Sequence, residues 1–306
     1  MTGATGFVGR HCLPLLAAQN YEVHAVARRA PASPAASGIA WHEVDLLTPG
    51  SSSEVVRALR PEYLLHLAWN AVPGEFWESP ENIEWVRASL ELLSAFAKNG
   101  GRRLLVAGSC AEYDWSTGEC NEYTTPLLPR TMYGTAKHAL ERILRSWSQQ
   151  TGVSSAWGRI FFMYGPHEHH SRLVAYVTRK LIQGDPALCS DGTQIRDFLH
   201  VEDVASAFVA LLESDVQGPI NIASGTPVAV RDLLLTIGRY LGRPELIHFG
   251  ARNSEGEPAA LWANVGRLSK ESVWKPHYDI EHGIQQTVEW WRGSDGLEKL
   301  VTPQRR

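Results

Sequence analysis

The chain has 306 residues, of which 44% are hydrophobic and 20% charged, and its formal net charge is −4. It is long enough to bury a large core, and it lacks the basic balance that binding to nucleic acid or to an anionic membrane requires. No apolar run reaches the roughly 18 residues of a membrane span, and the four scattered cysteines form no Cys-x-x-Cys pair. We therefore expect a cytoplasmic globular protein with reduced thiols that binds neither nucleic acid nor membrane.

The first ten residues place glycine at Gly3, Gly6 and Gly9 and continue into an amphipathic run. Glycine permits a tight turn and lets backbone N–H groups approach a phosphate, and a helix N-terminus adds a partial positive charge. This spacing predicts a strand-to-helix turn that binds the pyrophosphate of a dinucleotide; an ordinary glycine-rich turn is the alternative.

Only Met1 and Thr2 precede this turn, where a strand of about five residues is usual. We expect a truncated first strand, and of the two explanations we favour a missing upstream piece over a sheet that lacks most of this strand.

The next apolar segment, residues 22–27, ends in Arg28 and Arg29. In dinucleotide-binding folds an acidic residue at this strand end accepts hydrogen bonds from the adenosine ribose, whereas an arginine pairs with a 2′-phosphate. Because Ala27 holds the acidic position and Arg28 follows, the sequence favours NADP(H) over NAD(H); two merely solvated arginines are the alternative.

Apolar segments that read as strands alternate with helical periodicity along the chain. We expect strands at 39–44, 63–68 and 104–107, and helices at 55–59, 83–99, 133–150, 171–183, 201–212, 230–241 and 280–291. Short strands at 187–188 and 246–248 complete a C-terminal lobe, and 302–306 is expected to be disordered. The pattern predicts an α/β fold of Rossmann type, with a doubly wound parallel sheet and ligands at the carboxyl ends of its strands.

We divide the chain accordingly. Residues 1–165 are expected to form the NAD(P)-binding Rossmann domain, and residues 166–306 mainly a smaller α/β lobe that binds substrate, with some segments returning to the Rossmann core.

Three residues suggest the chemistry. Ser109 follows the strand at 104–107, and Tyr133 and Lys137, four residues apart, share one helix face. A tyrosine with a pKa near 10 is a weak acid–base group at neutral pH, but a nearby ammonium stabilises the phenolate, and a serine hydroxyl orients a substrate oxygen. Together with the glycine turn, the set predicts an enzyme that transfers hydride.

At this point the sequence resembles the extended short-chain dehydrogenase/reductase superfamily, in its nucleotide-sugar epimerase/dehydratase branch. The resemblance covers nearly the whole chain and rests on these motifs: Thr2-Gly3-Ala4-Thr5-Gly6-Phe7-Val8-Gly9, Asp45-Leu46, His66-Leu67-Ala68, Ser109-x-x-x-Tyr113, Tyr133-Gly134-x-x-Lys137, Tyr164-Gly165-Pro166, Arg196-Asp197-Phe198 with Asp203, and Asn221-Ile222-Ala223-Ser224-Gly225.

The resemblance implies that Tyr133 is the catalytic acid/base, that Lys137 lowers its pKa and holds the nicotinamide ribose, and that Ser109 binds the reacting oxygen. It places Arg196 near the pyrophosphate of a nucleotide sugar; an ion pair with Asp203 is the structural alternative. The residues expected to bind the cofactor are Gly3, Thr5, Gly6, Phe7, Val8, Gly9, Arg28, Asp45, Leu46, Leu67, Ala68, Trp69, Tyr133 and Lys137.

Departures from the family pattern limit the reactions that we expect. Its dehydratases carry Thr-Asp-Glu where this chain has Ser109-Cys110-Ala111, so dehydration is not expected. Cys110 is a candidate contact of the sugar, with packing as the alternative. A second phosphate-binding arginine does not align cleanly near Glu257: Arg252 is nearby but shifted, and Arg267 is another option. This leaves a non-nucleotide carbonyl substrate as an alternative.

Residues 167–170, His-Glu-His-His, are crowded without the spacing of a metal site. We interpret them as a substrate-facing loop without metal, with Arg172 just after it as a candidate ligand contact.

The sequence thus predicts an NAD(P)-dependent enzyme that exchanges hydride at a ring carbon, most simply C4, of a nucleotide sugar, either as an epimerase or as a 4-ketoreductase. A non-catalytic NAD(P)-binding sensor or scaffold is the alternative from another class. The family often dimerises through helices corresponding to 83–99 and 133–150, so we expect a homodimer.

Overall fold

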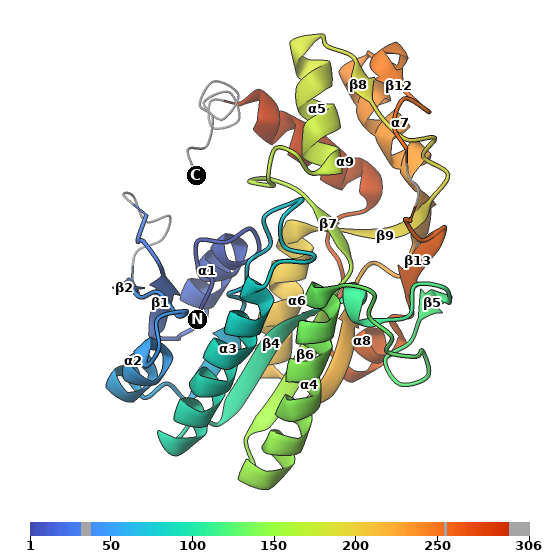
Figure 1. Ribbon diagram of the computed structural model, residues 1–306. Helices are drawn as coiled ribbons and strands as arrows, with labels where there is room; N and C mark the ends of the chain where they lie inside the picture. The colour runs from blue at the N-terminus through green and yellow to red at the C-terminus, as the bar shows by residue number, and fades with distance from the viewer. Residues whose placement is uncertain (32–37, 254–255, 294–306) are drawn as a thin grey trace.

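A parallel sheet forms the centre of the larger lobe (Figure 1). The computed structural model describes residues 1–31, 38–253 and 256–293, and the sheet consists of β1 (Val23–Ala27), β2 (Ile39–Glu43), β3 (Tyr63–His66), β4 (Arg103–Ser109), β6 (Ser154–Ile160) and β10 (Gly218–Ile222). Strands β2 and β1 pair with each other, and β3, β4, β6 and β10 pair in that order; every pair is parallel, and Thr2 bridges β1 to β3. This confirms the predicted Rossmann-type fold.

A single residue, Thr2, lies in the sheet position between β1 and β3. Thr2 forms parallel bridges with both Val26 and His66, and its N–H donates to the Leu65 carbonyl (3.0 Å). Beside it, between the amino ends of β1 and β3, lies a cavity of ≈ 360 Å³ whose lining includes Val23. Thr2 therefore stands in this structure where the first strand was expected to be short.

Helices cover both faces of this sheet (Figure 1). One face carries α1 (Gly9–Ala18) and α6 (Val201–Glu213), which contact each other, and the other carries α2 (Ser51–Leu59), α3 (Glu81–Lys98) and α4 (Met132–Thr151). None of the helices in the described part of the chain is long and apolar enough to cross a membrane.

Helix α4, which carries two of the predicted catalytic residues, has clear sequence-encoded ends. The Thr131 hydroxyl accepts the Gly134 N–H (3.1 Å) at its start, and Gly152 adopts a left-handed conformation (φ 74°) at its end. Between them Ala136, Leu140 and Leu144 form a buried stripe at helical spacing. This anchoring fixes the first turn of α4 at the carboxyl end of β4.

The smaller lobe is built around a second sheet and a strand pair. The sheet comprises β5 (Gly118–Cys120), β7 (Phe162–Tyr164), β9 (Ile195–His200), β11 (Pro227–Ala229) and β13 (Ala260–Ala263), and the pair is β8 (Ala187–Leu188) with β12 (Ile247–His248). The remaining elements are α5 (Leu173–Gln183), α7 (Val230–Leu241), α8 (Gly266–Glu271), α9 (Ile280–Arg292) and the 3₁₀ turns η1 (Cys110–Glu112) and η2 (Pro244–Leu246). Helices α5, α7 and α9 form the upper part of Figure 1.

The chain crosses between the lobes more than once. Strand β10 pairs with β6 in the central sheet, and α6 packs on α1, although both lie after residue 165. In the opposite direction, β5 pairs with β13 of the smaller lobe. The prediction of disorder at 302–306 lies outside the described residues.

Candidate active site

The three glycines of the first turn are required by close backbone packing. Gly3 has a φ of +69°, and a Cβ there would lie 2.7 Å from the backbone nitrogen of Ala68. A Cβ on Gly9 would lie 2.1 Å from the carbonyl oxygen of Gly3. Helix α1 then begins without a side-chain cap and without an acidic residue in its first turn, so its N-terminus is suited to an anion.

A cavity of ≈ 290 Å³, called here the cofactor cavity, opens beside this turn. Seven of the predicted cofactor residues line it: Gly3, Thr5, Gly6, Arg28, Leu46, Ala68 and Trp69. The same walls also include Leu47, Asn70, Ala71, Val72, Glu81 and Trp85, which were not among the predicted cofactor residues. The tight glycine turn and the uncapped helix N-terminus fit a dinucleotide.

Other predicted cofactor residues lie outside the lining. Val8 and Gly9 are buried where the turn joins α1, and Phe7 packs against the core beside them. Asp45 is exposed, and its carboxylate accepts the N–H of Leu47 (3.1 Å). The aspartate therefore shapes the loop that presents Leu46 to the cavity.

Tyr133 and Ser109 come together from α4 and β4. The Ser109 hydroxyl acts on the Tyr133 phenol as a hydrogen-bonding neighbour that lowers the pKa of Tyr133, while burial raises that pKa by more. The phenol ring is held edge-on by Phe76 (ring centroids 4.8 Å apart) and Trp77 (5.8 Å). The tyrosine is thus protonated in the protein without ligand and fixed in orientation.

Lys137 is 3% exposed, one helical turn after Tyr133. Its ammonium donates to the Ala107 carbonyl (2.8 Å) and lies 3.8 Å from the centroid of the Trp69 ring. Burial lowers the pKa of Lys137 to about 7, and the charge of Glu112 opposes this shift. Trp69, predicted as a cofactor residue, therefore also contacts Lys137, which was predicted to be catalytic.

A buried network beneath Ser109 fixes the serine. The Ser109 N–H donates to Glu112 Oε1 (2.8 Å), and the Ser109 hydroxyl accepts the Ala111 N–H (3.2 Å), which together form a capping box for η1. Glu112 in turn accepts from Arg159 Nε (2.8 Å) and Trp157 Nε1 (2.9 Å), and both members of the Glu112–Arg159 pair are fully buried. The sequence analysis missed this network, although Ser-x-x-Glu is a recognisable capping signature.

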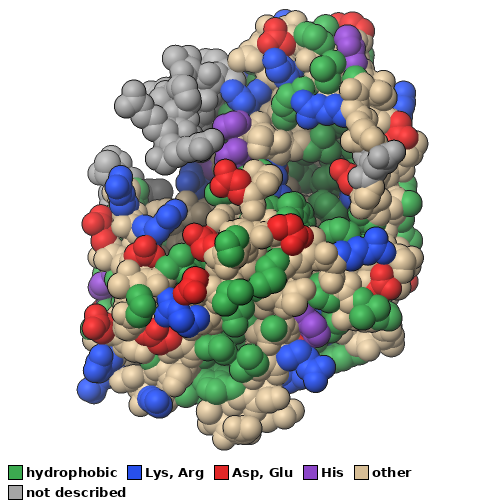
Figure 2. Space-filling view, in the orientation of Figure 1, with side chains coloured by type: hydrophobic (Ala, Val, Ile, Leu, Met, Phe, Trp, Pro, Cys, Tyr) green, Lys and Arg blue, Asp and Glu red, His purple; other side chains and the backbone are tan. Residues whose placement is uncertain are grey.

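Between the lobes lies a cavity of ≈ 350 Å³, called here the catalytic cavity. The larger lobe contributes Ser109, Cys110 and Tyr133 to it, and the smaller lobe contributes Arg172 and Arg196, all of them predicted. The cavity also has an aromatic and apolar wall of Phe76, Trp77, Phe161, Phe162, Met163 and Phe198, and Glu168 reaches it from the loop at 167–170 that was expected to face the substrate. Figure 2 shows the hollow between the lobes with hydrophobic side chains on its walls.

The ion pair of Arg196 differs from the predicted structural alternative. Arg196 Nη2 lies 3.4 Å from Glu257, whereas Asp203 accepts the backbone N–H groups of His277 (2.8 Å) and Tyr278 (2.9 Å). Asp203 is unavailable to Arg196 because it caps the turn before α9. Arg196 is buried at the cavity wall, and its partner Glu257 is largely exposed.

Cys110, predicted as a sugar contact, lines the catalytic cavity as a thiol. Burial raises the pKa of Cys110 to about 12, so it is protonated at neutral pH. It can contact a ligand but supplies no base.

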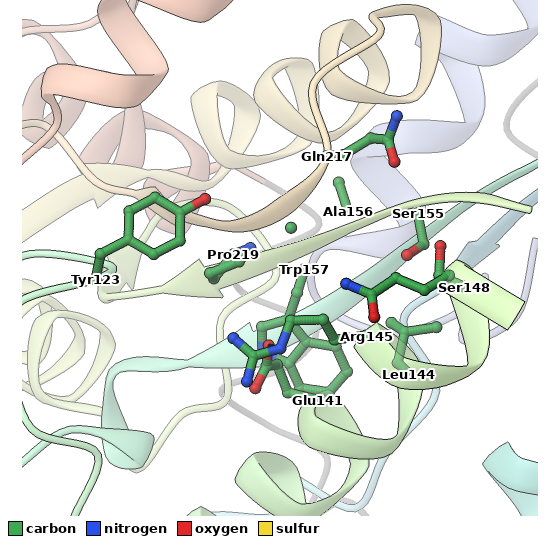
Figure 3. Close-up of a pocket in the computed structure, with 12 residues that line it drawn as sticks. Tyr123, Glu141, Leu144, Arg145, Ser148, Ser155, Ala156, Trp157, Gln217 and Pro219 are labelled. Carbon is green, nitrogen blue, oxygen red and sulfur yellow. Dashed lines mark ion pairs between the residues drawn. The ribbon is translucent and has the colours of Figure 1, made fainter. Parts of the chain in front are cut away.

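A further cavity of ≈ 240 Å³ lies between α4, β6 and β10 (Figure 3). Its lining includes Glu141 and Arg145, whose closest charged atoms are 4.0 Å apart, and Trp157. None of the predicted catalytic or binding residues lines it, so we do not assign it to the active site.

A glycine turn on a parallel sheet, with Ser109 at the carboxyl end of β4 and Tyr133 and Lys137 near the amino end of α4, defines a dinucleotide-dependent enzyme of the short-chain dehydrogenase type. Residues 1–223 match the profile described as "NAD dependent epimerase/dehydratase family", and the chain belongs to this family.

Relatives extend this comparison over the whole chain. GDP-6-deoxy-D-mannose reductase of Pseudomonas aeruginosa is 26% identical and aligns with 95% of this chain and 96% of its own length. UDP-glucose 4-epimerase of Rhizobium leguminosarum bv. trifolii is 27% identical over 81% of this chain and 83% of its own. The crystal structure of UDP-glucose 4-epimerase of Thermus thermophilus in complex with NAD superposes with a TM-score of 0.83 over 96% of this chain and 98% of that chain, at 24% identity.

The comparisons confirm the predicted family and fold. They also confirm the predicted function at the level of its class, an NAD-dependent nucleotide-sugar oxidoreductase or epimerase, rather than the non-catalytic alternative.

Proposed function

We propose that this enzyme exchanges hydride at C4 of a nucleotide sugar, as a 4-epimerase or as a 4-ketoreductase. The observation that carries the proposal is that Ser109 and Tyr133 face one cavity that also contains Arg196, next to the cofactor cavity. A bound nicotinamide dinucleotide supplies or accepts the hydride. Both chemistries occur among the relatives by name, since one is a UDP-glucose 4-epimerase and another a GDP-6-deoxy-D-mannose reductase.

In this proposal side chains transfer the proton, orient the sugar oxygen and bind the diphosphate. The Tyr133 hydroxyl gives a proton to the sugar oxygen or its phenolate accepts one, and the Ser109 hydroxyl donates to the same oxygen and orients it. Lys137 favours the phenolate through its charge. Arg196 is the candidate partner of the diphosphate, which has to replace Glu257 as the counter-ion of the guanidinium.

Dehydration fits this set less well than hydride exchange at C4. Cys110 stays protonated and Ala111 has no functional group, so the positions that carry the acid and base in the family's dehydratases supply neither.

The dinucleotide that copurifies with the protein distinguishes the two versions. An epimerase recycles its cofactor, so we expect denatured protein to release it in a one-to-one ratio, measured by chromatography of the supernatant. An empty protein that then binds NADPH would indicate a ketoreductase with a stoichiometric reductant. Binding of no nicotinamide dinucleotide would contradict the proposed function.

We also propose that NADP(H) is preferred, because Arg28 lines the cofactor cavity directly after Ala27. Arg28→Ala should weaken NADPH binding by about tenfold, which corresponds to the ~1.4 kcal/mol of one charge-assisted contact, and leave NADH binding unchanged. Calorimetric titration with both dinucleotides measures this. Arg29→Ala is the matched control, since Arg29 is exposed and lies outside the cavity lining; equal losses for NADPH and NADH in Arg28→Ala would contradict the preference.

Three further assignments belong to this proposal. Residues 1–165 bind the cofactor and 166–306 mainly the substrate, and the protein acts in the cytoplasm. It forms a homodimer through α3 and α4, which expose the apolar side chains of Ile83 (57%) and Ile143 (44%).

A further inference from the structure

One carboxyl group of the catalytic cavity has no role in the mechanism above. Glu168 lies in the loop between β7 and α5, is 5% exposed and lines the cavity together with Ser109 and Tyr133. Its Oε2 has no hydrogen-bond partner within residues 1–31, 38–253 and 256–293. Because a buried polar atom without a partner costs stability, its position calls for an explanation.

The backbone holds Glu168 in this position. His167, just before it, adopts a left-handed conformation (φ 69°), which costs roughly 1–2 kcal/mol for a residue other than glycine. The Glu168 N–H donates to the Gly165 carbonyl (3.3 Å), and a Cβ on Gly165 would lie 2.6 Å from Val201 Cγ1 of α6. The loop is therefore packed against α6, and the cavity-facing position of Glu168 is imposed by the fold.

Burial and the neighbouring polar groups act on the pKa of Glu168 in opposite directions. The neighbouring charge is Arg172, whose guanidinium lies over the Phe76 ring (5.9 Å), and the Ala175 N–H in the first turn of α5 faces the carboxyl. Burial raises the pKa of Glu168 to about 8, and these two groups act in the opposite direction. The other ionisable groups of the cavity lining are Cys110, Tyr133, Cys189, Arg196 and Glu257.

Glu168 is distinct among these groups. Glu257 is paired with Arg196 and is 59% exposed, whereas Glu168 is buried, and Cys110 and Tyr133 are protonated at neutral pH. A carboxyl that exchanges its proton near pH 8 is matched to general acid–base catalysis.

We propose that Glu168 is a second acid–base residue of the catalytic cavity, which moves a proton at a sugar carbon adjacent to C4 when C4 is a ketone. This inference rests on the proposed function, because it requires a 4-keto nucleotide sugar in the cavity. Cys110 and Ala111 have no group that can take a proton from a sugar carbon. In this proposal Glu168, in the loop after β7, takes it instead.

The step balances without a further reactant. The Glu168 carboxylate takes the proton of C3 or C5, the C–H electron pair forms a carbon–carbon double bond, and the C4 carbonyl pair moves to oxygen. The hydroxyls of Ser109 and Tyr133 donate to that oxygen. Return of a proton from Glu168 restores the ketone, so the hydrogen on the adjacent carbon exchanges with solvent.

The test uses UDP-4-keto-6-deoxyglucose, which already carries the ketone, in deuterium oxide with the protein as purified. We expect the wild-type protein to incorporate deuterium next to C4, detected by mass spectrometry, and Glu168→Gln to lose at least ~100-fold of the exchange rate. The wild-type rate should rise about tenfold per pH unit below pH 8 and level off above it, as the carboxylate fraction does.

A purely structural role for Glu168, as a cap of α5, makes a different prediction. Glutamine can still accept the Ala175 N–H, so under either role Glu168→Gln should keep the affinity for the keto sugar and the melting temperature. Glu281→Gln, an exposed change in the first turn of α9, is the matched control and should exchange like wild type.

The outcomes separate the two proposals. Exchange by Glu168→Gln at the wild-type rate, or by wild type no faster than in buffer, would overturn the role of Glu168 alone, provided that the keto sugar binds. Absence of binding of the keto sugar and of UDP-sugars to the wild-type protein would contradict the proposed function, and this inference with it.

Discussion

Tyr133→Phe should abolish hydride exchange while leaving the fold and cofactor binding intact. In the proposed function the phenol hydroxyl exchanges a proton with the sugar oxygen, and phenylalanine has no hydroxyl. The ring itself keeps its edge-on contacts with Phe76 and Trp77, so the α4 turn should be undisturbed. We expect a loss of ~10³ in turnover, within the range of general acid–base catalysis.

The near-ultraviolet absorbance of reduced nicotinamide measures this loss in single-turnover experiments with nucleotide sugars. Calorimetry with the dinucleotide and thermal unfolding show whether binding and fold persist. Tyr123→Phe is the matched control, because Tyr123 is 64% exposed and lies outside the catalytic cavity. Turnover within a few-fold of wild type in Tyr133→Phe would exclude the tyrosine as the acid–base group.

Features encoded by local spacing were predictable from the sequence. The glycine turn, the Tyr133 and Lys137 pair, and α7 at 230–241 depend on residues close together in the chain, and the structure places these elements as expected. Ser109 was predictable because it ends an apolar strand, β4, whose carboxyl end faces the start of α4.

Contacts between distant residues were not predictable in the same way. Glu112 and Arg159 are 47 residues apart, and a charged residue within a segment such as β6 argues against burial, so neither the pair nor that strand was predicted. The structural alternative for Arg196, an ion pair with Asp203, was wrong for a similar reason, since the observed partner Glu257 lies 61 residues away. Trp69 was predicted as a cofactor residue, but its contact with Lys137 depends on how β3 and α4 meet.

The role of Glu168 could not be predicted from the sequence alone. The sequence indicated a substrate-facing loop at 167–170, yet the composition His-Glu-His-His gave no reason to separate the glutamate from its neighbours. In the structure Glu168 is the member of this run that lines the catalytic cavity, whereas the hydroxyl of Ser171 holds the ring of His169 (2.8 Å). Burial and backbone conformation distinguish it, and neither is readable from residue type.

Glu112→Ala should destabilise the protein by about 3–5 kcal/mol, because it leaves the guanidinium of Arg159 buried without its counter-ion. It also removes the acceptor of the Ser109 N–H, so turnover should fall in the protein that remains folded. Urea unfolding followed by circular dichroism measures the free energy of unfolding.

Glu62→Ala is the matched control: Glu62 pairs with Arg102 at 3.1 Å, but both side chains are more than 60% exposed, so its loss should cost about 0–1 kcal/mol. Replacing Glu112 and Arg159 together by methionine removes the unpaired charge and should recover much of the stability but not the positioning of Ser109. Equal costs for Glu112→Ala and Glu62→Ala would show that water reaches Arg159 and that the buried pair does not hold Ser109 in place.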